Sequence, residues 1–533
     1  MFENKPLTTK DTKVHEGFFN PFVFLRALCG FVVLASAIPM LSCSGKPAPE
    51  TLVMLIEFSP SNLDPRVGTD AQSERIDELL FDSLVRKDEH FNIIPAVAQS
   101  WEVPDPQTYI FHLRRGIRFH DGRPLTARDV KWTLDTMRDG SLLTIKGGSY
   151  KPVENVEVKD DATLVMRLSE PYAPLLWNLA DGAFGIVPYG SGKDFNRDPI
   201  GSGPFRFVRN VPDSDVIIER NPDYWGERAQ VERVRFNVVP DTTTRALELR
   251  KGSADIAAAN SLTPDLVRTL RGQNHLEVAQ EPGTSVSYLA FNLRDPILAD
   301  VRVRQALAYA IDRRPMLHYL FGDAGRLADS VLPPEHWAYN GDVTHYPFDP
   351  AQANAILDAA GYARARDGVR FHLTMKTSTT EEASRLMAVV LQQQLREIGI
   401  ALDIRTFEFA TLYADILRGA FQMYSLRWVG YSNQDPDIFE DAFDSASFPP
   451  KRANRGRYSN SRVDELIAKG RRSSDQRQRK EIYAEVQRIL AHDLPYIDLW
   501  YLDNVMVHSD RVANLHVQPA GNYDFLVTAK LAQ

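Results

Sequence analysis

The stretch Pro199–Trp225, PIGSGPFRFVRNVPDSDVIIERNPDYW, predicts a β-hairpin that is entered by a tight turn. The two glycines near its start permit positive φ, and Pro204 fixes φ at about −65°. Residues 205–209 and 216–220 favour strands, and the Val-Pro-Asp-Ser-Asp segment between them favours a loop. The stretch ends on a Tyr-Trp pair. It carries no catalytic motif, so we interpret it as scaffold, a turn with packed aromatic residues.

The composition is that of a large globular protein. The chain has 533 residues, of which 44% are hydrophobic and 25% are charged, enough for a large core. The formal net charge of −8 argues against nucleic acid, which needs a concentrated basic face, and it tolerates a cationic or zwitterionic ligand. The two cysteines, Cys29 and Cys43, both lie near the N-terminus, so we expect no disulfide and no thiolate metal site in the rest of the chain.

The N-terminus has the pattern of a secretory signal. Residues 27–41 form an apolar run that follows Arg26, and the run is shorter than the roughly 20 apolar residues of a spanning helix. We therefore predict that residues 1–42 are a signal peptide.

The segment after the apolar run resembles the lipobox of bacterial lipoproteins. Its sequence is Leu-Ser-Cys-Ser-Gly over residues 41–45, and the resemblance implies that Cys43 becomes a lipidated first residue. The lipobox prefers leucine three residues before the cysteine, and Met40 stands there instead. Cleavage nearby and a short uncleaved anchor are the alternatives. Residues 43–50 would then form a tether.

The rest of the chain alternates between strand and helix patterns, which predicts α/β layers. We expect no metal site at His112, His120 and Asp121, which suit strand and turn positions better. The basic cluster near residue 475 is interpreted as a solvated helix face; it comprises Arg471, Arg472, Arg477, Arg479 and Lys480. The principal expected strands are 51–58, 109–113, 231–239, 253–257, 288–293, 400–407 and 422–429, and the principal helices are 74–84, 242–252, 302–311, 381–398, 413–418, 463–469 and 479–490.

Several of these segments resemble the signatures of the peptide and nickel class of extracytoplasmic solute-binding proteins, the receptors of ABC importers. Besides the hairpin, the resemblance rests on residues 61–65 (SNLDP), 95–101 (PAVAQSW), 109–130, 287–313 and 494–500. It covers nearly all of the chain that would remain after cleavage.

The resemblance implies a two-lobed periplasmic-binding-protein fold of type II with an extra subdomain. Lobe 1 would span residues 51–285, with the extra subdomain at about 76–195, and lobe 2 would span 286–494. Residues 495–533 would return to lobe 1. Two connections would cross between the lobes, near residues 283–287 and 493–499, and would act as a hinge.

The resemblance also points to a ligand loop at residues 426–437. In peptide binders an aspartate in this loop pairs with the α-ammonium group of the peptide, and Tyr431 stands at the matching position. Asp435 could replace the missing carboxylate, or it could belong to a structural Asp-Pro turn. Alternatively, the ligand has no free ammonium group and stacks on Trp428 and Tyr431.

Further ligand-binding candidates flank these residues. Arg427 could hold a carboxylate in a bidentate manner or form a surface ion pair. Trp428 could face the cleft or pack in the core. Gly430 and Asn292 complete the set.

These features predict a receptor rather than an enzyme. The sequence has no P-loop, no Gly-x-Ser-x-Gly elbow and no His-Glu-x-x-His motif. We expect a monomeric, lipid-anchored periplasmic protein without a cofactor that delivers a small solute, in the first place a peptide, to an ABC permease. The alternatives are a non-peptide solute, such as an oligosaccharide, a metal chelate or haem, and a receptor that signals to a partner.

Overall fold

The computed structural model describes residues 50–144, 146–180, 182, 184–379, 381–429 and 435–532, which belong to one compact unit. The predicted signal peptide, Cys43, nearly all of the tether, Gly430 and Tyr431 lie outside these residues. In the described part of the chain, no helix is long and apolar enough to cross a membrane.

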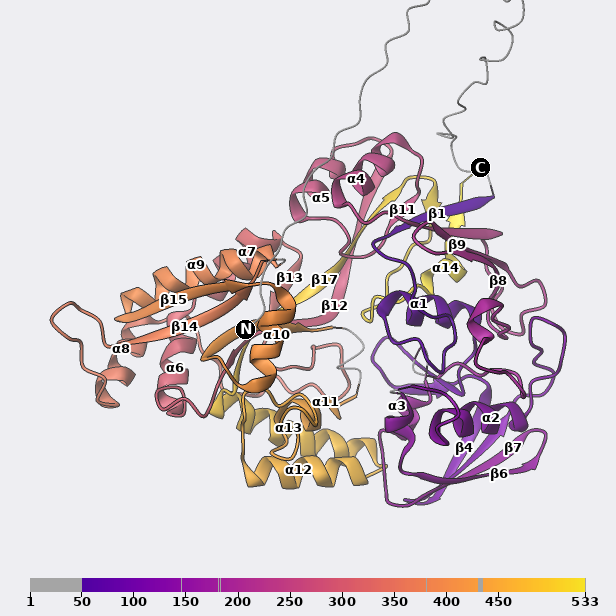
Figure 1. Ribbon diagram of the computed structural model, residues 1–533, viewed down its shortest axis with the longest axis horizontal. Helices are drawn as coiled ribbons and strands as arrows, with labels where there is room; N and C mark the ends of the chain where they lie inside the picture. Colours follow the sequence, from indigo (N-terminus) through magenta and orange to yellow (C-terminus); the bar gives the residue numbers. More distant parts are fainter. Residues whose placement is uncertain are drawn as a thin grey trace, which may run out of the picture. The chain divides into compact units, whose positions relative to one another are not determined.

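One large mixed sheet organises the described residues (Figure 1). Ten of its strands run in the order β15-β14-β16-β12-β17-β11-β1-β10-β9-β8, and β13 pairs with β17. In this order their bounds are β15 Ile400–Phe407, β14 Phe371–Ser378, β16 Met423–Trp428, β12 Leu276–Phe291, β17 Tyr496–Ser509, β11 Ile256–Ala257, β1 Thr51–Ile56, β10 Arg233–Val238, β9 Asp215–Arg220 and β8 Phe205–Val211, with β13 at Gly325–Leu327.

The long strands β12 and β17 join the two halves of this sheet. They pair antiparallel from Leu276 opposite Ser509 to Ala290 opposite Tyr496, with two irregularities in register. On one side β1 runs parallel to β10 and β11, and on the other β14 runs parallel to β15 and β16. Each half therefore has parallel strands whose carboxyl ends can carry a site.

Helices flank the sheet and follow the predicted apolar spacing. The expected helix at 242–252 is confirmed as α4, which ends at Gly252 with φ 74°. The helix bounds are α1 Ala71–Leu80, α2 Ala127–Arg138, α3 Leu175–Asn178, α4 Thr242–Lys251, α5 Pro264–Arg271, α6 Val301–Ala310, α7 Arg313–Phe321, α8 Pro350–Ala359, α9 Glu382–Glu397, α10 Phe409–Arg418, α11 Ile438–Phe443, α12 Ser461–Arg472, α13 Gln476–Asp493 and α14 Phe525–Thr528.

A second, four-stranded sheet has its own hydrophobic core. Its order is β4-β5-β7-β6, and helix α2 packs on it. The core cluster around it draws its residues from Leu84 to Ile186, within the range predicted for the extra subdomain. The strand bounds are β4 Ala98–Asp105, β5 Thr108–Leu113, β6 Val153–Asp160 and β7 Thr163–Leu168; the short pairs are β2 Val85–Lys87 with β3 Ile93–Pro95 and β18 Val512–Ala513 with β19 Lys530–Leu531.

The predicted hairpin is confirmed as β8 and β9, and a buried carboxylate fixes its ends to α1. Asp82 accepts hydrogen bonds from Ser202 Oγ at 2.9 Å, Tyr224 Oη at 3.0 Å and Trp225 Nε1 at 2.8 Å. Burial raises the pKa of Asp82. A Cβ atom on Gly201 would lie 1.8 Å from the carbonyl oxygen of Leu80, so the close approach to α1 requires glycine.

The basic cluster of α12 and α13 is not uniformly solvated, and the prediction is wrong for Arg479 and Arg471. Arg479 is 1% exposed, because the inner face of α13 packs against α3 and the loop after β13. Its guanidinium carbon lies 4.8 Å from the ring centre of Trp177 and 5.3 Å from that of Trp337. Arg471 forms ion pairs of 2.6 Å with both Asp437 and Glu440.

Candidate functional site

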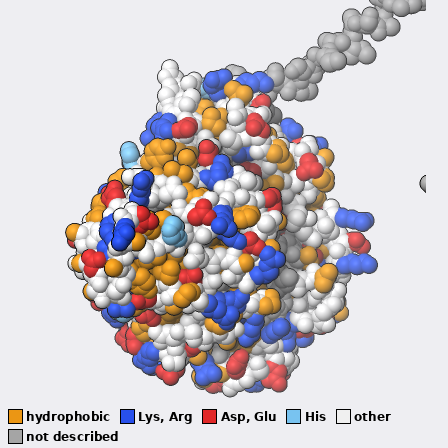
Figure 2. All heavy atoms as spheres, turned by 60° about the vertical axis from the view of Figure 1, so that its left-hand side comes forward, with side chains coloured by type: hydrophobic (Ala, Val, Ile, Leu, Met, Phe, Trp, Pro, Cys, Tyr) orange, Lys and Arg blue, Asp and Glu red, His pale blue; other side chains and the backbone are white. Residues whose placement is uncertain are grey.

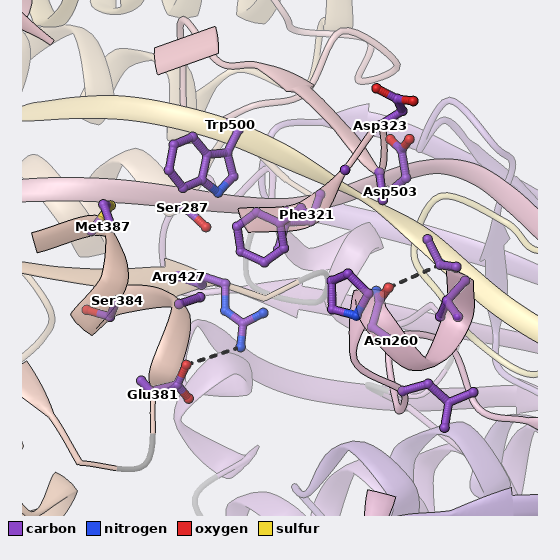
Figure 3. Close-up of a pocket in the computed structure, with 18 of the residues that line it drawn as sticks. Asn260, Ser287, Phe321, Asp323, Glu381, Ser384, Met387, Arg427, Trp500 and Asp503 are labelled. Carbon is purple, nitrogen blue, oxygen red and sulfur yellow. Dashed lines mark hydrogen bonds and ion pairs between the residues drawn. The ribbon is translucent and has the colours of Figure 1, made fainter. Parts of the chain in front are cut away.

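A cavity of about 690 Å³ lies where the carboxyl ends of parallel strands from both halves of the sheet approach one another (Figure 3). Asn260 follows β11, Glu381 follows β14, Phe409 follows β15 and Val429 follows β16. Helices α5, α7 and α9 and strands β12, β16 and β17 contribute further lining residues. This is the place where open α/β sheets characteristically bind ligands.

Three neighbouring strands present side chains to the cavity from one row of the sheet. Ser287 on β12 is directly opposite both Arg427 on β16 and Trp500 on β17. Residues directly opposite one another in antiparallel strands share a face, and all three line the cavity. Figure 3 shows Ser287 between the other two.

Much of the lining is apolar. Phe321 and Trp500 pack with ring centres 5.8 Å apart, and Met387 is 2% exposed. Phe409 and Val429, which are 40% and 58% exposed, add accessible apolar surface to the lining. The other apolar residues of the wall are Leu262, Pro264, Val267, Ala324, Ala383, Leu426, Leu502 and Val505.

The charged groups of the lining balance. Three carboxylates (Asp323, Glu381 and Asp503) face three guanidinium groups (Arg268, Arg271 and Arg427), so their formal charges cancel. Such a lining suits a ligand that carries both signs of charge better than one that carries a single sign.

Among the three carboxylates, Asp503 is held in the protein by two donors. Arg326 Nη1 donates to its Oδ1 at 3.0 Å, and Gln280 Nε2 donates to its Oδ2 at 2.9 Å. Burial raises the pKa of Asp503, while these two donors oppose the change.

Strand β16 offers one free edge at the cavity. Its pairing with β14 covers Met423 and Tyr424, whereas its pairing with β12 continues to Trp428. Within the described residues, 425–428 therefore have a strand partner on one side only. Three of these four residues (Ser425, Leu426 and Arg427) line the cavity. A strand edge of this kind can pair with the backbone of an extended chain.

The structure places the predicted ligand residues in different surroundings. Arg427 lines the cavity and lies 3.9 Å from Glu381, with the side chain 44% exposed. Trp428, the next residue, is 9% exposed and points to the opposite face of the sheet. There it stacks on Tyr288 with ring centres 6.0 Å apart and lies under the guanidinium group of Arg455. A ligand role for Trp428 stays a prediction.

Asp435 and Asn292 make bonds within the protein. Arg479 Nη2 donates to both carboxylate oxygens of Asp435, at 2.9 and 3.0 Å. The side-chain amide of Asn292 donates to the carbonyl oxygens of Gly419 and Phe421. Neither residue lines the cavity, and their roles in ligand binding also stay predictions.

Several lining residues were not singled out from the sequence. Ser287 and Trp500 lie at the ends of segments that were named for their resemblance to the family, 287–313 and 494–500, and Glu381 lies at the start of an expected helix. Strand alternation gives the missing signal once the register is known, because Ser287 and Trp500 share a face with Arg427. The register itself follows from pairings between distant segments.

Comparison with known proteins identifies the family. The model for "Bacterial extracellular solute-binding proteins, family 5 Middle" matches residues 92–449. The dipeptide-binding protein of Escherichia coli is 27% identical over 93% of this chain and 97% of its own length. Heme-binding protein A of Haemophilus influenzae is 27% identical over 88% and 89%. The structure of the oligopeptide-binding protein AppA of Bacillus subtilis with a nonapeptide superposes with a TM-score of 0.72 at 26% identity, covering 91% of this chain and 99% of that one.

The match to the family model extends over more than half of the chain, and the fold agrees with that of the two-lobed family 5 proteins. The chain therefore belongs to the bacterial extracellular solute-binding proteins of family 5.

Proposed function

We propose that this protein captures peptides in the cavity at β16 and delivers them to the membrane-spanning subunits of an ABC importer. The peptide ligands named for the Escherichia coli and Bacillus subtilis relatives support this proposal. The protein acts by binding, and we expect it to catalyse no reaction.

The free edge of β16 is the observation that carries the proposal. An extended peptide can add there as a strand, with its main chain pairing with residues 425–428. The apolar wall offers contacts for side chains, and the balanced charges suit a zwitterion. The volume of about 690 Å³ falls in the ordinary range for small-molecule sites.

We further propose that two lobes close on the ligand, with lobe 1 at 51–285 and 495–533 and lobe 2 at 286–494. Strands β12 and β17, which join the two halves of the sheet, would absorb the hinge motion. Small-angle scattering of the monomer with and without peptide should show a smaller radius of gyration in the bound form. An unchanged radius would contradict closure.

The N-terminal segment would place the receptor at the cell envelope. We propose that residues 1–42 direct export and that Cys43 carries the lipid, with 43–50 as a tether. Labelled palmitate should enter the wild-type protein but not a Cys43→Ala variant. Equal labelling of both would remove the lipid anchor from the proposal.

A thermal-shift panel tests the ligand class. The panel contains dipeptides, longer peptides, nickel, haem and oligosaccharides. Haem is included because one relative is named for it. A true ligand at one hundred times its Kd should raise the free energy of unfolding by about 2.7 kcal/mol. Stabilisation by peptides alone supports the proposal, and stabilisation by non-peptide compounds alone refutes it.

A further inference from the structure

We propose that Glu381 binds the free amino group of the ligand, and that Arg427 donates to the adjacent ligand carbonyl. This inference rests on the proposed peptide function and names the residues that would recognise the amino terminus of the bound peptide. It assigns the role to the ion pair at the cavity wall rather than to Asp435.

The carboxylate of Glu381 is weakly engaged within the protein. Glu381 occupies the N-cap position of α9, yet its side chain makes no capping hydrogen bond. Its ion pair with Arg427 has an N···O distance of 3.9 Å, longer than a hydrogen bond. Both side chains are close to half exposed, at 46% for Glu381 and 44% for Arg427. An incoming cation can therefore displace Arg427 without stripping buried groups of their partners.

The other nearby carboxylates are less suitable. Asp435 has both oxygens bound by the buried Arg479. Asp503 already accepts from Arg326 and Gln280. Asp323 has a side chain that is 94% exposed and lies beside His318, so an ammonium group there would stay largely hydrated. Glu381 combines access to the cavity with a free hydrogen-bonding capacity.

The spacing of the pair matches the amino end of a peptide. An α-aminoacyl group presents an ammonium nitrogen and a carbonyl oxygen about 3 Å apart. Glu381 Oε2 and Arg427 Nη2 are an acceptor and a donor 3.9 Å apart, pointing toward each other in Figure 3. A ligand that lies alongside the two atoms could form two charge-assisted hydrogen bonds, one with each, in place of the one long ion pair. Arg427 also lies on the free edge of β16, and pairing with this edge would position the remaining backbone of the peptide ligand.

The test uses calorimetric titration with the dipeptide that gives the largest shift in the panel, and with its N-acetyl derivative, which lacks the charge. Glu381→Gln keeps the shape and removes the charge. We expect it to weaken binding of the free dipeptide by about 10- to 100-fold and to leave the N-acetyl form unchanged. Glu382→Gln is the matched control, because Glu382 is exposed and does not line the cavity. It should change neither affinity.

Other outcomes overturn the inference in distinguishable ways. An equal loss for both ligands in Glu381→Gln would mean that the residue acts through structure. No loss for either would place the amino group elsewhere. If the wild-type protein binds no peptide of the panel, the proposed function itself is refuted and the inference falls with it. Melting curves of each variant without ligand exclude a folding defect as the cause.

Discussion

Arg479 and Arg427 stand in opposite kinds of surroundings, although both pair with a carboxylate. Arg479 is 1% exposed and packs against the rings of both Trp177 and Trp337, where it binds Asp435. Arg427 is 44% exposed and reaches Glu381 at 3.9 Å. The first ion pair is buried and makes two hydrogen bonds, whereas the second is exposed to solvent and has an N···O distance too long for a hydrogen bond.

The two arginines differ in how readily their charge can be turned to a ligand. Removing one member of a buried pair leaves a desolvated charge, so such a pair holds its geometry whatever the ligand does. An exposed long pair contributes little to stability and can exchange partners at little cost. Arg479 therefore serves the fold, and the exposed pair is consistent with the ligand role that we propose for Arg427.

The arginine clamp, which we define as Trp177, Trp337, Asp435, Arg479 and Tyr483, also joins distant parts of the chain. Trp177 lies on α3, next to the four-stranded sheet, whereas Arg479 lies on α13. The backbone amide of Ala173 donates to the carbonyl oxygen of Arg471 at 2.7 Å in the same contact. The clamp thus ties the region of the second sheet to α12 and α13.

The largest effect is expected when the clamp loses its charge. Arg479→Ala should lower the free energy of unfolding by about 3–5 kcal/mol. Asp435 is left buried without a counter-ion, and the two indole rings lose the guanidinium group that packs against them. Urea denaturation measures this loss. A loss below about 1 kcal/mol would show that the Arg479–Asp435 pair is not buried in solution, and the contrast with Arg427 would not hold.

A smaller effect is expected at the other end of the same pair. Asp435→Asn should cost about 2 kcal/mol, because one amide oxygen still accepts from Arg479 while the charge is lost. Melting curves without ligand measure it. If Asp435→Asn instead leaves stability unchanged and lowers peptide affinity, Asp435 is the ligand carboxylate and Glu381 is not.

The sequence predicted the regular parts of these regions well. The strand at 400–407 agrees with β15 at both ends, and Gly252 ends α4 as expected. Local patterns suffice there, because apolar periodicity and a positive-φ glycine are properties of a few adjacent residues. Arg427 and Trp428 became ligand candidates in a different way, through the resemblance of residues 426–437 to the ligand loop of the family.

Local sequence patterns could not distinguish a charged side chain that is buried in an ion pair from one that is exposed to solvent. Arg479 lies in a run of basic residues that is typical of an exposed helix face, and its partners Trp177 and Trp337 are more than a hundred residues away. Likewise, strand alternation requires Arg427 and Trp428 to face opposite sides, but it cannot say which side holds the cavity. Only the tertiary packing decides which face of β16 borders the cavity.

A dependence of stability on pH is expected beside the clamp. Burial raises the pKa of Asp437 to about 7, against the opposing guanidinium group of Arg471. Between about pH 4 and 7 the folded state then holds a proton that the unfolded state has lost, so stability falls as pH rises. The slope from this one group is about 1.4 kcal/mol per pH unit at most.

Asp437→Asn removes this titration. Its free energy of unfolding, measured by urea denaturation from pH 4 to 8, should fall less steeply than that of the wild type over pH 4–7 and run parallel to it above pH 7. Parallel curves over the whole range would mean that the Arg471 ion pair keeps Asp437 ionised.

The smallest effect on stability is expected at Arg427, where the comparison is sharpest. Arg427→Ala should change the free energy of unfolding by less than about 0.5 kcal/mol, because a half-exposed ion pair at 3.9 Å adds little to the folded state. The same variant should weaken peptide binding by about tenfold through loss of the donor to the ligand carbonyl. Melting curves and titrations on one preparation separate the two quantities. A destabilisation comparable to that of Arg479→Ala would show that exposure does not distinguish the two arginines, and the assignment of one to the fold and the other to the ligand would fail.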